Sequence, residues 1–179
     1  MPKMITDPET YFRKFVPERE DLLRKLETEA EKEEIPIIGP VAAELLYILA
    51  RTCGAKAILE LGAATGYSGI YLARAAMENG GRLDTLEWDP EMAKKAEANF
   101  ERAGVSGFVD IHGGDALESL QNLPGPFDFA FLDIDKEFYV HALPLLHVRM
   151  KTGGLLVADN VAFKDSIPFN RAVADSPQW

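Results

Sequence analysis

The chain has 179 residues, 47% of them hydrophobic and 27% charged, and its 29 acidic and 19 basic side chains give a formal net charge of −10. This length and composition are those of one soluble globular domain, and so acidic a surface disfavours nucleic acid as a partner, although a local basic patch can still exist. A single cysteine excludes an intrachain disulfide and a cysteine-based zinc site. No apolar run approaches the roughly 20 residues of a membrane span, and no signal peptide is evident. We therefore expect a cytoplasmic protein without membrane contact.

The first 55 residues are predicted to be helical. Apolar residues at helical spacing predict a helix over 17–33, with Pro17 in its first turn. Gly39-Pro40 opens a second predicted helix, which ends near Gly54. The second helix is expected to bury Val41, Leu45, Leu46, Ile48 and Leu49.

From residue 56 onward, short apolar strands alternate with amphipathic helices. The predicted strands cover 57–61, 82–87, 108–112, 127–133 and 154–159. The predicted helices cover 67–78, 90–103, 116–122 and 137–150, the last interrupted or restarted by Pro144. This alternation predicts an α/β fold with a doubly wound, mainly parallel sheet and helices on both faces. We expect a single domain over 1–179, with N-terminal helices over 1–55, a core over 56–162 and a short loop and helix over 163–179.

A tight glycine turn follows the first strand of this sheet. Glycines stand at 62 and 66, between a strand that contains Glu60 and the helix that begins near Tyr67, and a third stands at 69 in the first turn of that helix. The spacing differs from the dinucleotide fingerprint, and no Gly-Lys-Ser/Thr closes a phosphate loop. Taken alone, the turn fits a simple strand-to-helix connection as well as a site where a polar ligand meets bare backbone.

Acidic side chains stand at the ends of the next two strands. Glu87 ends the second strand, where an acid can accept hydrogen bonds from the hydroxyls of a ribose or can be an ordinary surface residue. Asp115 and Ala116 follow Gly113-Gly114 at the end of the third strand. Asp115 can accept a hydrogen bond from an exocyclic amine, and it is equally placed to cap the following helix.

Strands four and five end in a cluster of oxygen ligands. Strand four ends in Asp133, with Asp135 and Lys136 close behind, and strand five ends in Asp159 and Asn160. Two carboxylates and an amide oxygen are a ligand set suited to Mg²⁺ completed by water and substrate. Asp159 and Asn160 reach one ion only if the chain already turns there. A metal-free alternative, with the acids contacting ligand amines or water, stays open.

These segments together resemble the class I S-adenosylmethionine-dependent methyltransferases, and in particular the metal-dependent O-methyltransferases that include the catechol and caffeoyl-coenzyme A enzymes. The resemblance runs from about Ile35 to Val161. It is carried, in order and at family-like spacing, by the motifs LELGAATGYS, LEWDPE, GGDA, FLDIDK and ADN. The resemblance implies a Rossmann-like sheet of strand order 3-2-1-4-5.

The resemblance also implies roles for individual residues. S-adenosylmethionine would contact Ile38, Glu60, Gly62, Ala63, Ser68, Glu87, Asp115, Ala116 and Asp133. Mg²⁺ or a similar divalent cation would bind Asp133, Asp159 and Asn160. Lys136 matches the lysine proposed to deprotonate the acceptor hydroxyl. A divalent ion orients and acidifies a bound hydroxyl, and positioning supplies most of the remaining acceleration. The acceptor is expected to be a small hydroxylated molecule of the catechol type.

The C-terminal region departs from the family pattern. Family members usually continue through two further strands, whereas residues 163–179 offer a short loop and one helix. By this comparison the usual final two strands are missing, through truncation or natural shortening. An unpaired edge strand favours an oligomer, for which a homodimer is one possibility, or a marginal monomer.

Two alternative functions stay open. One is methylation of a hydroxylated transfer RNA base, and the other is a catalytically idle S-adenosylmethionine-binding domain. The first requires a basic surface, for which the candidates are Arg13, Lys14, Arg19, Arg24 and Lys25.

Overall fold

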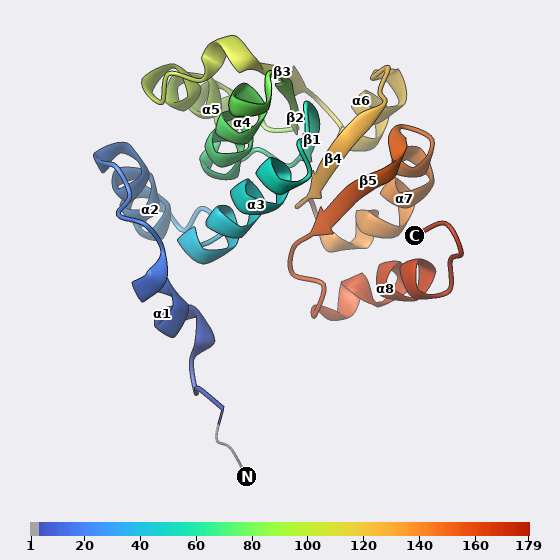
Figure 1. Cartoon of the computed structure of the whole chain (residues 1–179), viewed down its shortest axis with the longest axis horizontal. Coiled ribbons are helices and arrows are strands. Elements are labelled where there is room, and N and C mark those ends of the chain that lie inside the picture. The colour runs from blue at the N-terminus through green and yellow to red at the C-terminus, as the bar shows by residue number, and fades with distance from the viewer. Residues whose placement is uncertain (1–3) are drawn as a thin grey trace.

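The computed structural model describes residues 4–179 and contains a parallel sheet of five strands in the order β3-β2-β1-β4-β5 (Figure 1). This confirms the predicted fold class and strand order. The strands are β1 (Ala57–Leu61), β2 (Arg82–Glu87), β3 (Val109–Gly113), β4 (Phe127–Leu132) and β5 (Met150–Ala158). The α-helices are α1 (Pro8–Phe12), α2 (Asp21–Glu33), α3 (Pro40–Thr52), α4 (Tyr67–Asn79), α5 (Pro90–Arg102), α6 (Ala116–Asn122), α7 (Tyr139–His147) and α8 (Ile167–Ala174). The 3₁₀ turns are η1 (Arg13–Phe15), η2 (Ser106–Phe108), η3 (Lys136–Phe138) and η4 (Lys164–Ser166).

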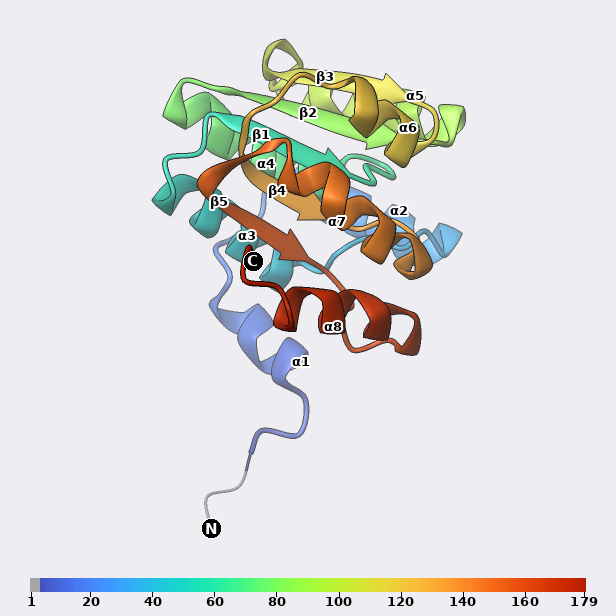
Figure 2. The ribbon, with the colours of Figure 1, turned by 90° about the vertical axis from the view of Figure 1, so that its right-hand side faces the viewer.

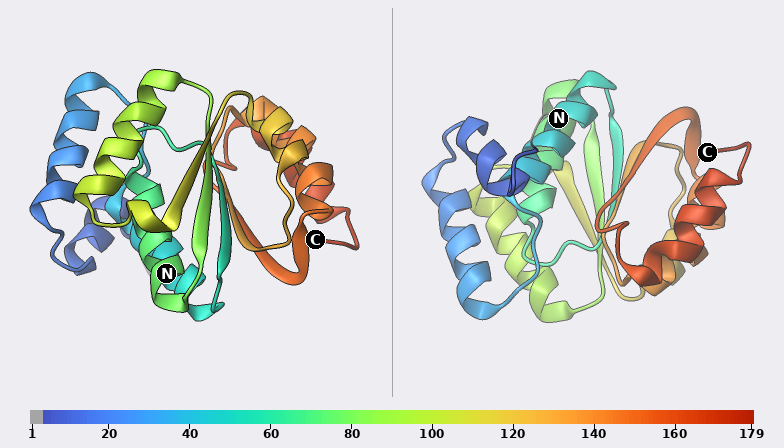
Figure 3. Two further views of the ribbon diagram at one scale, coloured as in Figure 1. Left: turned by 90° about the horizontal axis from the view of Figure 1, so that it is seen from above. Right: turned by 90° about the horizontal axis from the view of Figure 1, so that it is seen from below.

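Each face of the sheet carries its own hydrophobic core. Successive strand residues point to opposite faces, so that Ile58 packs with α3, α4 and α5 while Leu59 packs with α6, α7 and α8. Figure 3 shows the two helical layers on either side of the sheet. The central strands are covered on both faces, which explains why β4 reads as an almost continuous apolar run.

The N-terminal helices differ from the prediction. The segment 17–20 is extended and α2 begins at Asp21 rather than at Pro17, while α1 and η1 precede it without having been predicted. The buried face of α3 is also different from the predicted one. It is made of small residues and one leucine, whereas two predicted core residues, Leu45 and Ile48, are 53% and 49% exposed. The buried side chains of α3 are Pro40, Ala43, Leu46 and Ala50.

The strands and helices from residue 57 onward lie close to their predicted bounds, with two exceptions. β5 begins at Met150, four residues earlier than predicted, because Phe127 pairs with Met150 before a register shift occurs between Phe127 and Phe129. The last predicted helix over 137–150 is shorter, and Pro144 lies inside α7 without ending it.

β5 is the outermost strand of the sheet on its side. Among residues 4–179, it pairs with β4 alone, and no further strand follows it (Figure 2). Within the same residues, no helix combines the length and the apolar character needed to cross a membrane.

Candidate active site

A cavity of about 940 Å³ opens at the carboxyl ends of the strands. This is where ligands bind in open parallel sheets. The predicted site residues that line it are Ile38, Gly62, Ala63, Ser68, Glu87, Asp115, Ala116, Asp133, Lys136, Asp159 and Asn160. The fold thus brings together side chains from the ends of all five strands with one residue from the N-terminal region.

The glycine turn after β1 forms one wall of this cavity. Gly62 has φ +99°, and a Cβ atom there would lie 2.2 Å from the carbonyl oxygen of Asp133. Gly66 has φ +83° and precedes the first residue of α4. Both positions favour glycine because the backbone is left-handed there, and Gly62 in addition passes directly against the end of β4. The turn leaves bare backbone facing the cavity.

Glu87 accepts hydrogen bonds from the backbone of this turn. Its Oε2 atom accepts from the amides of Ala63 and Ala64 at 3.1 and 2.7 Å, and its Oε1 atom accepts from the amide of Asp89 at 2.9 Å. The side chain is nearly buried. Glu87 therefore fixes the glycine turn, and its contact with a ribose stays a prediction.

Glu60 lies beneath the turn and is not among the residues that line the cavity. It shares a face of β1 with Ile58, under α4. Its Oε2 atom accepts a hydrogen bond of 2.6 Å from the hydroxyl of Thr85, while its Oε1 atom has no partner. Burial raises the pKa of Glu60 to about 7, although the hydroxyls of Ser68 and Thr85 oppose the shift. Direct contact between Glu60 and a ligand in the cavity would require this side chain to move.

Asp115 has the predicted capping role, and its contact with an exocyclic amine stays a prediction. Its Oδ1 atom accepts a hydrogen bond of 2.9 Å from the amide of Glu118 and so caps α6, while the residue also lines the cavity. The capping bond satisfies one free amide at the start of α6.

The ends of β4 and β5 lie side by side and line the cavity on the other side of β1 from Glu87 and Asp115. The ammonium group of Lys136 donates hydrogen bonds to Asp133 Oδ1 at 2.7 Å and to the carbonyl of Ile134 at 3.0 Å. Burial raises the pKa of Asp133, and the nearby charge of Asp159 raises it further, while Lys136 opposes both effects. Asn160 has φ +52°, so the chain turns immediately after β5 as a shared ligand set requires.

A buried tyrosine braces these two strand ends. The hydroxyl of Tyr139 lies 2.9 Å from the carbonyl of Leu132 and 3.2 Å from the carbonyl of Asp159.

The oxygen atoms at these strand ends fit a hard divalent ion, because Asp133 and Asp159 supply carboxylate oxygens and Asn160 an amide oxygen. Within residues 4–179, no group of three or more His, Cys, Asp or Glu side chains could hold a metal ion, so a site here depends on Asn160.

Several residues that line the cavity were not predicted. The exposed Trp88 directly follows Glu87 in a strand-end turn, and this position was a usable signal. The sequence of the segment 33–37 carried no such signal, because this segment follows the N-terminal helices and reaches the cavity only through the tertiary fold. The unpredicted residues include Glu33, Glu34, Ile35, Pro36, Ile37, Ala64, Tyr67, Trp88, Asp89, Met92, Leu117 and Phe138.

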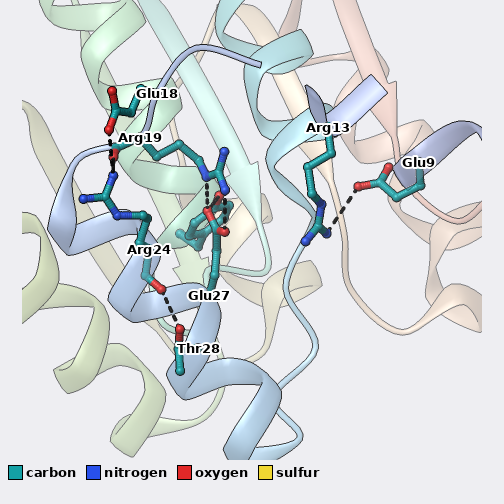
Figure 4. Close-up of polar contacts among 8 residues, drawn as sticks. Glu9, Arg13, Glu18, Arg19, Arg24, Glu27 and Thr28 are labelled. Carbon is teal, nitrogen blue, oxygen red and sulfur yellow. Dashed lines mark hydrogen bonds and ion pairs between the residues drawn. The ribbon is translucent and has the colours of Figure 1, made fainter. Parts of the chain in front are cut away.

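Most of the candidate basic patch is neutralised by acids. Arg13 lies 3.6 Å from Glu9, and Arg19 lies 2.7 Å from Glu27 (Figure 4). Arg24 pairs with Glu18 and Asp21, and Lys25 pairs with Glu29. Four of the five candidate residues thus have an acidic partner, which removes most of the charge that a phosphate backbone would meet.

Comparison with known proteins shows that this chain is similar to methyltransferases. Residues 15–174 match the model of the O-methyltransferase family. A catechol O-methyltransferase of Niastella koreensis is 44% identical over 128 residues, which are 69% of this chain and 58% of that protein. A catechol O-methyltransferase of Mycobacterium tuberculosis is 38% identical over 135 residues, 74% of this chain and 61% of that protein. The chain therefore spans about three fifths of the length of these relatives.

Solved structures of O-methyltransferases are also similar to this chain. The O-methyltransferase TomG from Streptomyces achromogenes, in complex with SAM, has a TM-score of 0.79 and 31% identity, and the match covers 94% of this chain and 75% of that one. An O-methyltransferase from Bacillus cereus, in complex with SAH, has a TM-score of 0.80 and 30% identity, and covers 95% of this chain and 79% of that one.

Proposed function

Because the chain belongs to the O-methyltransferase family, we propose that it transfers the methyl group of S-adenosylmethionine to a hydroxyl oxygen of a small, catechol-like molecule. One observation carries this proposal. A single cavity is lined by the glycine turn, by Glu87 and Asp115 at neighbouring strand ends, and by the acids that follow β4 and β5. The relatives named for catechol methylation, and the solved relatives in complex with SAM or SAH, support the same reaction.

The cofactor would occupy the part of the cavity nearest the glycine turn. The cavity volume of about 940 Å³ lies within the usual range for small-molecule sites. The bare backbone at Gly62 and Ala63 admits close approach by the methionine end, and Glu87 and Asp115 offer carboxylates to the ribose and the adenine. Glu87 would exchange part of its bonding with the turn for bonds to the ribose hydroxyls.

Asp133, Asp159 and Asn160 would hold Mg²⁺ or a similar divalent cation. Such an ion, when bound, acidifies and orients an acceptor hydroxyl. Lys136 stands beside this set and, after releasing one ammonium proton to solvent, would take the hydroxyl proton at its neutral Nζ atom. The acceptor oxygen would then attack the methyl carbon in line, so that the O–C bond forms as the C–S bond breaks and the sulfonium becomes a neutral thioether. Positioning of the two reactants supplies most of the acceleration.

Methyl transfer to a panel of catechols and to bulk RNA, each with Mg²⁺ and with excess chelator, tests the proposal. We expect a catechol to be methylated in the presence of Mg²⁺, and we expect this methylation to be lost in excess chelator. Transfer that continues unchanged in chelator would refute the metal requirement. Transfer to RNA alone would favour the transfer RNA alternative, and binding of the cofactor without any transfer would favour an idle domain.

A further inference from the structure

Tyr67 joins the cofactor cavity to helix α2. It is the first residue of α4, it lines the cavity, and its side chain is fully buried. Its hydroxyl donates a hydrogen bond of 2.6 Å to Glu27 Oε1. Burial raises the pKa of the Tyr67 phenol, and the bond to Glu27 raises it further, so the hydroxyl keeps its proton at neutral pH and remains a donor.

Glu27 is itself held in place by Arg19. The guanidinium donates from Nε to Glu27 Oε1 at 2.7 Å and from Nη2 to Oε2 at 3.2 Å (Figure 4). Both side chains are less than one fifth exposed. Bidentate pairs of this kind are among the stronger polar contacts and fix the orientation of the carboxylate. The Arg19–Glu27–Tyr67 triad therefore connects the extended segment 17–20, α2 and α4.

Helix α2 has few other anchors. Only Leu23, Leu26 and Ala30 of its thirteen residues are buried. The ion pair of Glu33 with Lys95 lies at the end of the helix and is about half exposed on both sides. An exposed pair of this kind contributes little to stability. Arg74 on α4 also pairs with Glu20, the N-cap residue of α2, whose side chain is about half exposed. The position of α2 therefore depends strongly on the less exposed Arg19–Glu27–Tyr67 triad.

The end of α2 runs directly into one wall of the cavity. Residues 33–38 are six consecutive residues that all line it. Glu27 lies six residues before Glu33, which is less than two turns of helix. A displacement of α2 at Glu27 would therefore be passed on to the 33–38 segment.

We infer that the Arg19–Glu27–Tyr67 triad positions the 33–38 segment against the cofactor cavity and thereby strengthens cofactor binding. Tyr67, Glu27 and Arg19 are positioning residues, since the triad acts through the wall that it holds. The inference rests on the proposed function in one respect, because its binding test uses S-adenosylhomocysteine, the product that the proposed cofactor leaves after methyl transfer.

The chain offers a matched control for the hydroxyl of Tyr67. Tyr47 on α3 donates to Glu78 on α4 at 2.9 Å, and Arg51 lies 2.7 Å from Glu78. This second arginine–glutamate–tyrosine triad also joins two helices, but none of its three residues lines the cavity. Tyr47→Phe and Tyr67→Phe remove the same atom from two contacts of the same chemical kind, of which the Tyr47 contact is exposed and the Tyr67 contact is part-buried.

Binding of S-adenosylhomocysteine, measured by calorimetry, is the first test. Tyr67→Phe should raise the dissociation constant about tenfold, the effect of losing one part-buried hydrogen bond. Tyr47→Phe should leave the dissociation constant unchanged. A parental dissociation constant in Tyr67→Phe, or an equal rise in both variants, would overturn the inference.

Hydrogen exchange of the amides in the 33–38 segment, in which Pro36 has no N–H, separates this inference from the proposed function, because it needs no cofactor. Exchange in this segment should be faster in Tyr67→Phe and in Glu27→Leu than in the parent. Glu27→Gln should restore most of the protection, since a carboxamide oxygen still accepts the Tyr67 hydrogen bond. Unchanged exchange in Tyr67→Phe would refute the triad's role even if the parent binds the cofactor. Failure of the parent to bind S-adenosylhomocysteine would instead refute the proposed function, while the exchange result would still decide the role of the triad.

Discussion

Glu60 is a fully buried acid whose carboxylate has one free oxygen. Burial raises its pKa from 4.5 to about 7 in the folded protein. Between these two pH values the folded state holds a proton that the unfolded state has released. The free energy of unfolding should therefore fall as pH rises from about 4.5 to about 7, and this stabilisation is absent above the folded pKa.

Glu60→Gln should remove this dependence, because a carboxamide does not titrate. The stability of the variant relative to the parent should be greater at pH 8 than at pH 5 by about 2–3 kcal/mol. Urea unfolding at both pH values measures the difference, and Glu101→Gln on the exposed side of α5 is the control. Parallel pH profiles for Glu60→Gln and the parent would show that Glu60 does not titrate in this range.

Lys136 pairs with Asp133 just after β4, and a second lysine–aspartate pair joins β4 to β5. Lys136→Met should lower turnover by roughly 10²–10⁴-fold, as expected for loss of a general base, and should leave cofactor affinity nearly constant. Lys151→Met is the control, since Lys151 pairs with Asp128 at 2.5 Å at the start of these strands, away from the cavity. If Lys136→Met kept more than about a tenth of parental turnover at pH 7, the proton would have to leave by another route.

At the scale of the element, the turn between β1 and α4 depends on glycine. A Cβ atom at Gly62 would collide with the Asp133 carbonyl, whereas one at Gly80, where φ is +72°, would meet no atom within 4 Å. Gly80→Ala should therefore cost about 1–2 kcal/mol of stability through backbone strain alone. Gly62→Ala should cost distinctly more, because the turn must also move away from β4. Chemical denaturation compares the two variants, and equal losses would contradict the proposed close approach.

Contacts between elements also explain the positions of two other side-chain sets, one on α7 and one on α3. Tyr139 ties the end of β4 to the end of β5, so that Asp133 and Asp159 are held on neighbouring strands. Helix α3 buries Ala43, Leu46 and Ala50. Small side chains at two of these positions allow close packing against α4, and larger residues such as Leu45 and Ile48 remain outside.

At the scale of the whole molecule, the open edge of β5 is the most consequential feature. Within residues 4–179 this edge has no strand partner. Large apolar side chains are exposed on α3 and on the segment after β5, among them Leu45, Ile48, Phe163 and Ile167. Unpaired edges and exposed apolar side chains favour association. We therefore propose that the protein forms a homodimer.

Sedimentation velocity over a range of protein concentrations tests this proposal. The parent should sediment as a dimer, and Ile48→Glu, which places a charge on the exposed face of α3, should shift it towards the monomer. Met77→Glu on α4 is the control, since Met77 is also exposed but lies on a helix that contacts the sheet mainly at β1 and β2. A monomer at all concentrations would refute the proposal.

The sequence by itself determined the strand order through its resemblance to the family, and the strand-end residues through the alternation of strands and helices. The carboxyl ends of parallel strands meet at one edge of the sheet, so Gly62, Glu87, Asp115, Asp133 and Asp159 had to come together once the strands were identified. This inference needs only the strand positions, which local hydrophobic patterns reveal.

Only the tertiary structure decided which of these side chains face the cavity and what closes it. Glu60 points beneath the glycine turn, because its position in β1 places it on the face that α4 covers. The 33–38 segment reaches the cavity through the packing of α2 against α4, and the basic residues near α2 are neutralised by acids from the same region. Side-chain direction and helix packing arise from contacts between segments distant in the chain, which no local pattern encodes.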